Sequence, residues 1–350
     1  MAAFRQRDPQ TGALQFDSGA GDRAAIILGS MTIDYSSNPD GSISVPALDG
    51  ARPFAFVRGE AYLGRPNVTF SGGTLTWART PTQGGSYPTT GTFELLYGGI
   101  DLVTLGGASG PRMTLWNDAG KIVFTTRFAI YQHLGRTSAS KLASGFQRAD
   151  AWLINPPGAV NPARMVAIRP VGAPAGPMGT YYTAAGPTGI RLAAPNSWTG
   201  AGDFYLIEKP SIVAAKPGLN TRSPITGELT FSSAQQCTRA VDIINGAPGS
   251  WVGTPGRTYA AIFPGLIGYH GDEETEVTQN AGGGLIIGDD PPYWVWTGYA
   301  LTVQARDGAP HILDFDWLQH SGNLYGVKKS SPQPVTYNTG SIMIVDVTGL

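Results

Sequence analysis

Asp314 and Asp316 are the two residues of this chain whose types and spacing come closest to a catalytic pair. They stand in a run of alternating apolar and polar residues. On a β-strand both carboxyl groups would face the same side, about 6.5–7 Å apart. That separation overlaps the spacing of the acid and the base in inverting glycosidases. Alternation along a solvent-facing strand explains the same pattern without chemistry, and we favour that interpretation.

An acidic run at residues 272–276, beside His270, could hold a hard cation through its carboxylates. The run lacks the regular spacing and the central glycine of an EF-hand loop, so a solvated loop is the better interpretation. The other histidines are scattered along the chain, and none has the paired spacing of zinc ligands. They are His133, His311 and His320. We therefore predict no catalytic residue, no metal site and no cofactor.

Cys237 is the single cysteine of the chain, which excludes an intrachain disulfide and a site with several cysteine ligands. Its position favours a structural residue at the start of a strand. Three glycine clusters, at residues 98–99, 106–107 and 282–284, lack the sequence context of a phosphate-binding loop. We interpret them as β-turns.

Aromatic residues beside polar loops are the candidates for a binding surface. Flat aromatic faces in such places suit protein contacts or sugar stacking. The candidates are Tyr293, Trp294 and Trp296, then Trp198, then Tyr87. Ordinary burial in a β core is the alternative, since aromatic residues make up 10% of the chain.

Composition indicates the kind of elements that position these residues. The 350 residues include 48 Gly and 27 Pro, and 14% are charged, which is typical of short strands joined by tight turns. The net charge of −1 and the lack of a basic run argue against nucleic acid as a partner. The chain contains no run of 18 apolar residues, so no membrane helix is expected. It shows no signal-peptide pattern, so Sec-dependent secretion is not expected.

A repeated pattern organises the chain. Phe16, Phe124 and Phe231 each end an alternating strand that follows a glycine-containing turn, at intervals of 108 and 107 residues. An arginine and a second apolar strand follow each phenylalanine. The pattern predicts an all-β fold with three tandem antiparallel β-sandwich-like modules, at residues 1–105, 106–217 and 218–310. We expect residues 311–350 to be a C-terminal β extension that adds strands to the third module or docks on a neighbouring chain. Residues 138–145 could form one short turn of helix.

The opening of these modules resembles a module of tail-tip, baseplate and tail-fibre proteins of long-tailed bacteriophages. The matching stretches are residues 11–18 (TGALQFDS) followed by Arg23, and residues 226–233 (TGELTFSS) followed by Arg239. The middle copy lacks the Pro and the Asp but keeps Arg127. The resemblance implies a virion structural protein of the distal tail that contributes to tail assembly and host attachment. It brings no catalytic residues.

The partners implied are other tail or baseplate proteins and a glycan or pilus receptor on the host surface. No membrane insertion is expected, and assembly would take place in the cytoplasm of the host bacterium. We expect a homo-oligomer: three like modules could match a threefold tail axis as a pseudo-trimer within one chain or as arms of a true trimer. Two alternatives stay open, an array of carbohydrate-binding modules and, less favoured, a glycan depolymerase that uses Asp314.

Overall fold

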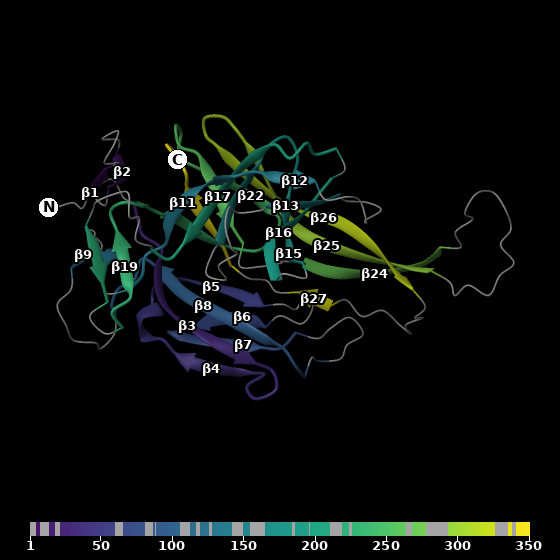
Figure 1. Ribbon diagram of the computed structural model, residues 1–350, viewed down its shortest axis with the longest axis horizontal. Coiled ribbons are helices and arrows are strands. Elements are labelled where there is room, and N and C mark those ends of the chain that lie inside the picture. The colour runs from purple at the N-terminus through teal and green to yellow at the C-terminus, as the bar shows by residue number, and fades with distance from the viewer. Residues whose placement is uncertain are drawn as a thin grey trace, which may run out of the picture.

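The protein is all-β, as the composition predicts (Figure 1). The computed structural model describes residues 5–7, 14–17, 22–59, 66–80, 87, 89–105, 113–116, 120–125, 128–141, 150–154, 165–183, 186–195, 197–210, 219–223, 226–263, 268–277, 293–325, 335–337 and 341–350. In those ranges there is no α-helix, and a 3-10 turn, η2 (Pro46–Leu48), precedes β5. The short helix suggested for residues 138–145 is wrong where the structure describes it, because Ala139–Lys141 forms strand β12.

Three two-stranded hairpins open the three repeats predicted from the sequence. They pair β1 (Arg5–Arg7) with β2 (Leu14–Asp17), β9 (Thr114–Trp116) with β10 (Ile122–Thr125), and β18 (Asn220–Arg222) with β19 (Leu229–Ser232). In each hairpin the repeated phenylalanine faces the middle residue of the first strand. In each, the pairing then skips the residue just before that phenylalanine. This identical bulge turns the same side chain inward three times, since a one-residue shift exchanges the two faces of a strand.

A set of three antiparallel strands follows each hairpin, with the last strand of the set in the middle. The sets are β3 (Ile26–Asp34), β8 (Thr92–Ile100) and β5 (Arg52–Gly59); β11 (Gln132–Thr137), β17 (Gly202–Glu208) and β14 (Met165–Pro170); and β21 (Arg239–Asn245), β28 (Ser341–Asp346) and β23 (Tyr259–Ile262). The second and third sets join through β14 and β23. With β20 (Gln236–Cys237) beside β11, they form a seven-stranded, strongly curled half-barrel.

Outer sheets cover these inner strands. They run β4 (Gly41–Ser44), β7 (Thr74–Ala78), β6 (Asn67–Ser71); then β12 (Ala139–Lys141), β13 (Asp150–Ile154), β16 (Gly186–Ala194), β15 (Gly176–Thr183); then β22 (Gly249–Val252), β26 (Ile312–Tyr325), β25 (Tyr293–Arg306), β24 (Gly268–Val277), β27 (Val335–Tyr337). Residues 311–350 supply β26, β27 and β28, and β28 lies between β23 and β21. The expected C-terminal extension therefore pairs with strands that precede residue 310.

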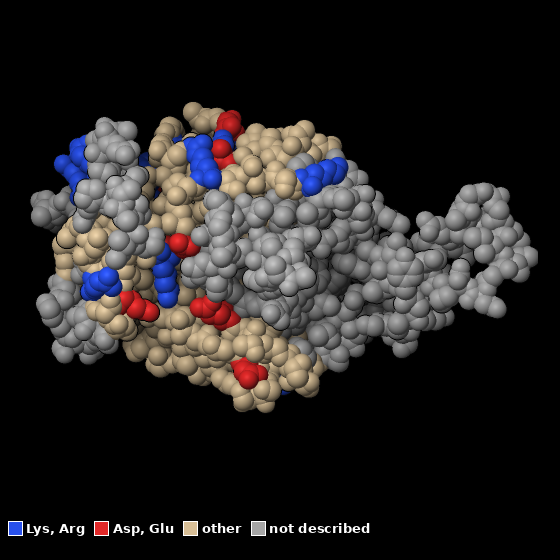
Figure 2. Space-filling model, viewed as in Figure 1, with Lys and Arg blue, Asp and Glu red and all other residues tan. Residues whose placement is uncertain are grey.

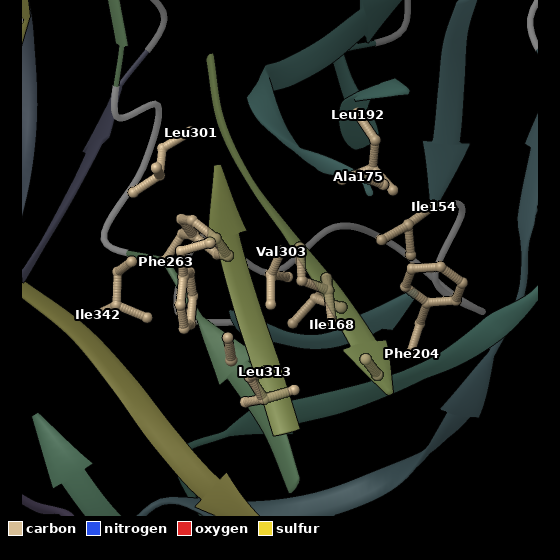
Figure 3. Packing of buried hydrophobic residues seen from close by; sticks show 14 of the residues in the cluster. Ile154, Ile168, Ala175, Leu192, Phe204, Phe263, Leu301, Val303, Leu313 and Ile342 are labelled. Carbon is tan, nitrogen blue, oxygen red and sulfur yellow. The ribbon is translucent and has the colours of Figure 1, made fainter. Parts of the chain in front are cut away.

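Alternate residues of the inner strands point to two different cores. Phe54 and Phe56 of β5 face a central core, whereas Ala55 and Val57 face an outer cluster. The central core also takes Met165 and Ala167 of β14, Ala260 and Ile262 of β23, Leu96 of β8, Tyr205 and Ile207 of β17, and Met343 and Val345 of β28. All three predicted modules therefore contribute to it. Figure 3 shows a second outer cluster, distinct from that of Ala55 and Val57, on the face of the half-barrel opposite the central core, where side chains of β14, β17, β25 and β26 gather.

The described residues thus do not divide into three separately packed cores. The β-turn expected at residues 98–99 is wrong, because both glycines lie inside strand β8. A Cβ on Gly98 would lie 2.0 Å from the carbonyl oxygen of Ile26 and 2.6 Å from the ring of Phe54. Glycine is required there because the backbone of β3 and a central-core ring approach the strand closely.

Candidate functional site

The three hairpins gather at one end of the molecule (Figure 1). We call the hairpins β1–β2, β9–β10 and β18–β19 the three-hairpin end. Below it, three chain segments pair with one another in a closed ring, each with the next. The pairs are Ala24 with Arg239, Ile26 with Ile130, and Gln132 with Cys237, all antiparallel. The ring brings together residues from the start of all three repeats.

Main-chain hydrogen bonds of equal length close this ring at its three corners. The donors are the amides of Ile27, Thr238 and Ala240, and the acceptors are the carbonyls of Ala129, Tyr131 and Arg23, each at 2.9 Å. Every corner links a different pair of repeats. The chain therefore places three equivalent strands around a common centre, as three subunits of a symmetric trimer would.

The repeated phenylalanines meet above this ring. Phe16, Phe124 and Phe231 are each at most 1% exposed and belong to one apolar cluster with Ile26, Ile130 and Cys237. The rings of Phe124 and Phe231 lie 5.3 Å apart, edge to face. An edge-to-face pair of aromatic rings is a favourable arrangement. The repeated phenylalanines therefore pack the three hairpins against one another.

Two buried glutamines, Gln6 of hairpin strand β1 and Gln132 of β11, bind the turn after β19. The Gln6 side chain donates to the carbonyl of Gln235 and accepts from the amide of Cys237. Gln132 donates to the carbonyls of Ser232 and Gln235 and accepts from the amide of Ser232. Each glutamine therefore satisfies main-chain groups of the third repeat that burial would otherwise leave unpaired.

Cys237 lies within this network and is 1% exposed. Desolvation raises the pKa of its thiol far above the usual value, and the contact with Gln132 opposes that shift only in part. A thiol held protonated is neither a nucleophile nor a metal ligand. The prediction of a structural cysteine is confirmed.

In the first and third repeats, the arginine that follows the repeated phenylalanine has an acidic partner that sequence reasoning missed. Arg239 donates to Asp346 at 3.1 Å and Arg23 contacts Asp101 at 3.2 Å. Each aspartate stands at or directly after the end of the middle strand of its set, β28 or β8. In the second repeat Glu208 ends β17, while Arg127 lies outside the described residues. The signal in the sequence was an acidic residue ending the last strand of each repeat.

Asp346 anchors a larger buried network. Its side chain is fully buried, and it also accepts from Arg257 at 2.5 Å and from the amide of Thr348 at 2.8 Å. Arg257 reaches Asp22 of the first repeat at 3.3 Å. These ion pairs join the first and third repeats close to the ring. They hold the packing of these two repeats together.

Of the predicted aromatic contact residues, the structure describes the side chains of Trp198 and Tyr87. Trp198 is 4% exposed and donates its indole N–H to the carbonyls of Ala201 and Val171, so the alternative of ordinary burial applies to it. Tyr87 is 56% exposed, with the Arg79 guanidinium 5.6 Å from its ring centre. Tyr293, Trp294 and Trp296 lie in strand β25, paired with β24 and β26, and their side chains are outside what the structure describes.

Asp314 and Asp316 share a face of β26, as alternation requires. Asp314 accepts hydrogen bonds from Arg306 (Nη2, 2.8 Å) and Ser250 (2.6 Å), and the Arg306 contact holds its pKa below the usual value. A general acid in a glycosidase needs the opposite shift. The geometry therefore favours a structural ion pair on a strand surface over a catalytic pair.

His133 and His311, the histidines whose side chains are described, belong to no cation site in the described part of the chain. No group of three His, Cys, Asp or Glu side chains suited to a metal occurs there. His133 is mostly buried beside the ring of Tyr205, and desolvation lowers its pKa to about 4. Burial also lowers the pKa of His311, which lies against Arg169. The side chains of residues 272–276, His270 and His320 are outside the described set.

The outer strands of the three-hairpin end present the most distinctive exposed surface. Each hairpin is a two-stranded sheet, so the outer edges of β1, β9 and β18 pair with no other described strand. Trp116 on β9 is 53% exposed, and Leu219, directly before β18, is 57% exposed. Elsewhere charged side chains are few on the face seen in Figure 2, where most described atoms belong to uncharged residues.

No described helix has the length and hydropathy needed to cross a membrane. Comparison of the chain with protein-family models, with curated proteins and with solved structures found no match in any of the three.

Proposed function

We propose that the chain is a non-enzymatic structural protein of a bacteriophage virion, located at the distal tail, where it contributes to tail assembly and host attachment. The observation that carries the proposal is the three-hairpin end: three hairpins of identical register, packed through one phenylalanine from each. A repeat used to build a closed, symmetric end suits a component that sits on the axis of an assembly.

The finer architecture belongs to the same proposal. The order of strands is the same in β3-β8-β5, β11-β17-β14 and β21-β28-β23, and a further sheet follows each set in the chain. This supports three copies of one sandwich-like module that merge at the central core. The closed ring favours a pseudo-trimer within one chain over three arms of a true trimer, and we propose that one chain takes the place of three subunits.

Purified phage particles test the proposal. Mass spectrometry of particles banded on a density gradient should find the chain, and antibody labelling should place it at the tail tip in electron micrographs. Light scattering of the isolated protein should give the mass of one chain, 36.8 kDa. Absence of the chain from particles that retain complete tails would refute the virion assignment.

A contact with host glycans is a second candidate, favoured by the exposure of Tyr87. Tyr87→Ala should weaken binding to host cells or to a glycan array if that ring stacks on a sugar. Trp116→Ala, which removes a similarly exposed aromatic ring on β9, is the control and should not weaken binding. Equal binding by both variants would remove Tyr87 from the candidates. Trp198 is unsuitable for such a contact because its ring is buried.

A further inference from the structure

We propose that the contact between Arg169 and His311 is an acid-sensitive latch, which holds the turn between β25 and β26 against β14 and opens when His311 binds a proton. The turn consists of residues 307–311. Arg169 of β14 donates to Asp203 of β17 at 2.6 Å and to Asp307 of the turn. Its guanidinium therefore joins the half-barrel of the second repeat to the outer sheet of the third. The latch goes beyond the proposed function and does not rest on it.

The third donor of Arg169 makes the contact sensitive to protonation. Its Nε–H group points at Nε2 of His311, 3.4 Å away. A neutral imidazole accepts a hydrogen bond only at the nitrogen that carries no hydrogen, so the geometry assigns the hydrogen of His311 to Nδ1. When Nε2 also binds a proton, two N–H groups and two positive charges face each other. The protonated form is therefore incompatible with the closed contact.

The surroundings of His311 disfavour its charged form in the closed turn. The residue is 2% exposed, and its Nδ1 has no hydrogen-bond partner in the structure. The titratable and charged groups that face it are Arg169, Asp307 of its own turn at 3.4 Å from Nε2, and Tyr259 of β23 with ring centroids 5.9 Å apart. Desolvation lowers the pKa of His311 and Arg169 lowers it further, while Asp307, which is 60% exposed, opposes the shift. An open turn, where water hydrates the imidazole, therefore binds the proton more readily than a closed one.

Other contacts confine the opening to the turn. The main chain of Val303 on β25 exchanges two hydrogen bonds with Ala175, at 2.9 and 3.0 Å, and its side chain packs in the same apolar cluster as Ile168 and Leu313. None of these groups titrates. The amide of Gly253, in contrast, donates to the carbonyl of His311 at 2.9 Å. Opening should therefore expose the Gly253 amide and leave the Val303 amide bonded, as in a local unfolding event.

Hydrogen exchange of the full chain tests the latch, with protection factors corrected for the intrinsic effect of pH on exchange. The protection factor of the Gly253 amide should fall by up to about tenfold for each pH unit below about 6.5, the limit for one bound proton. That of the Val303 amide should fall much less. His311→Gln, which keeps a hydrogen-bond acceptor but binds no proton in this range, should abolish the loss at Gly253. His133→Gln, at a mostly buried histidine on β11, is the control and should preserve that loss.

Nuclear magnetic resonance of the imidazole nitrogens gives a second readout, which needs no variant. At pH 7 the hydrogen should be on Nδ1 of His311, and its pKa should lie below 6.5. Arg169→Gln should raise that pKa because it removes the neighbouring charge. Arg136→Gln should leave it unchanged, since Arg136 contacts the same Asp203 at 3.5 Å but is 52% exposed and lies on β11.

Several results would overturn the latch. A hydrogen on Nε2 at pH 7 would show that Arg169 does not donate to His311. Equal loss of protection at Gly253 and Val303 would show that acid unfolds the whole sheet. The same pH dependence at Gly253 in His311→Gln as in the parent would assign the proton to another group.

Discussion

The ring of Phe124 meets the ring of Phe231 edge to face, with centroids 5.3 Å apart and planes at 82°, although 107 residues separate them in the chain. Their hairpins have the same register, and Phe16 of the first hairpin joins the same cluster. The contact therefore packs two copies of the sequence repeat directly against each other. Its removal should loosen two repeats at once.

Phe124→Ala should lower the free energy of unfolding by about 3–5 kcal/mol, because it empties a fully buried ring site. Phe231→Ala should cost a similar amount. In a double-mutant cycle the pair should show a coupling of about 0.5–1.5 kcal/mol, the range for aromatic pairs beyond their buried area. Urea unfolding of the four proteins measures all three quantities. Trp116→Ala, on the same hairpin as Phe124 but 53% exposed, is the matched control and should change stability by no more than about 0.5 kcal/mol. Additive losses in the double variant would contradict the contact.

Asp346→Asn should destabilise the protein by about 3–5 kcal/mol, since it leaves Arg239 and Arg257 without their shared carboxylate in a buried site. The side chain of Asp346 is fully buried, which is why the loss should be large. Asp314→Asn is the control, because its partner Arg306 is exposed and solvent screens the pair. Thermal unfolding of both variants decides the matter: equal shifts in melting temperature would show that Asp346 is no anchor.

Stability should fall as the pH drops from about 6.5 to about 4. Desolvation lowers the pKa of His133 from 6.5 to about 4, and the nearby Arg136 adds to this shift, while a hydrogen bond with the backbone of Gly135 opposes it. Between those values the unfolded chain binds a proton that the folded chain excludes, so acidification favours unfolding, by at most about 1.4 kcal/mol per pH unit for one proton. Above about pH 6.5 both states are neutral and the effect ends.

His133→Gln should reduce the change of the unfolding free energy with pH, measured by urea unfolding at pH 7, 6 and 5. Part of the pH dependence should remain. The reason is that burial also lowers the pKa of His311, in the same direction. The pKa values of Asp34, Asp40 and Asp314 are held below 3.8, so their effects are confined to more acidic solutions. Parallel curves for the variant and the parent would show that His133 titrates normally in the folded protein.

Gly98→Ala should destabilise the protein by about 1–3 kcal/mol or more, the range for overpacking a core. The new Cβ would meet the Ile26 carbonyl at 2.0 Å, and backbone cannot move aside as a flexible side chain can. Gly135→Ala is the control, because no atom lies within 4 Å of the corresponding Cβ and the strand conformation there is open to any residue. The difference between the two melting temperatures is the measurement, and a Gly98→Ala protein as stable as the control would disprove the close approach of β3 and β8.

The sequence alone was sufficient to predict an all-β chain and the equivalence of Phe16, Phe124 and Phe231. Both inferences rest on local signals: alternation along a strand, and a glycine turn at a fixed distance from an aromatic residue. The retained arginines were visible as well. Their acidic partners were harder to find, because Arg239 and Asp346 are 107 residues apart in the chain and meet through strand pairing.

Tertiary structure decided how the repeats share their interiors. The sequence of a strand such as β5 shows apolar residues on both of its faces, but it does not show which other strands cover each face. The central core is assembled from all three repeats, and the close approach of β3 and Phe54 there is why Gly98 lies inside a strand. Trp198 is buried in a different cluster, which takes side chains from the second and third repeats. These positions depend on long-range packing, because the free energy of burying apolar surface is proportional to the buried area and does not depend on how far apart the residues are in the chain.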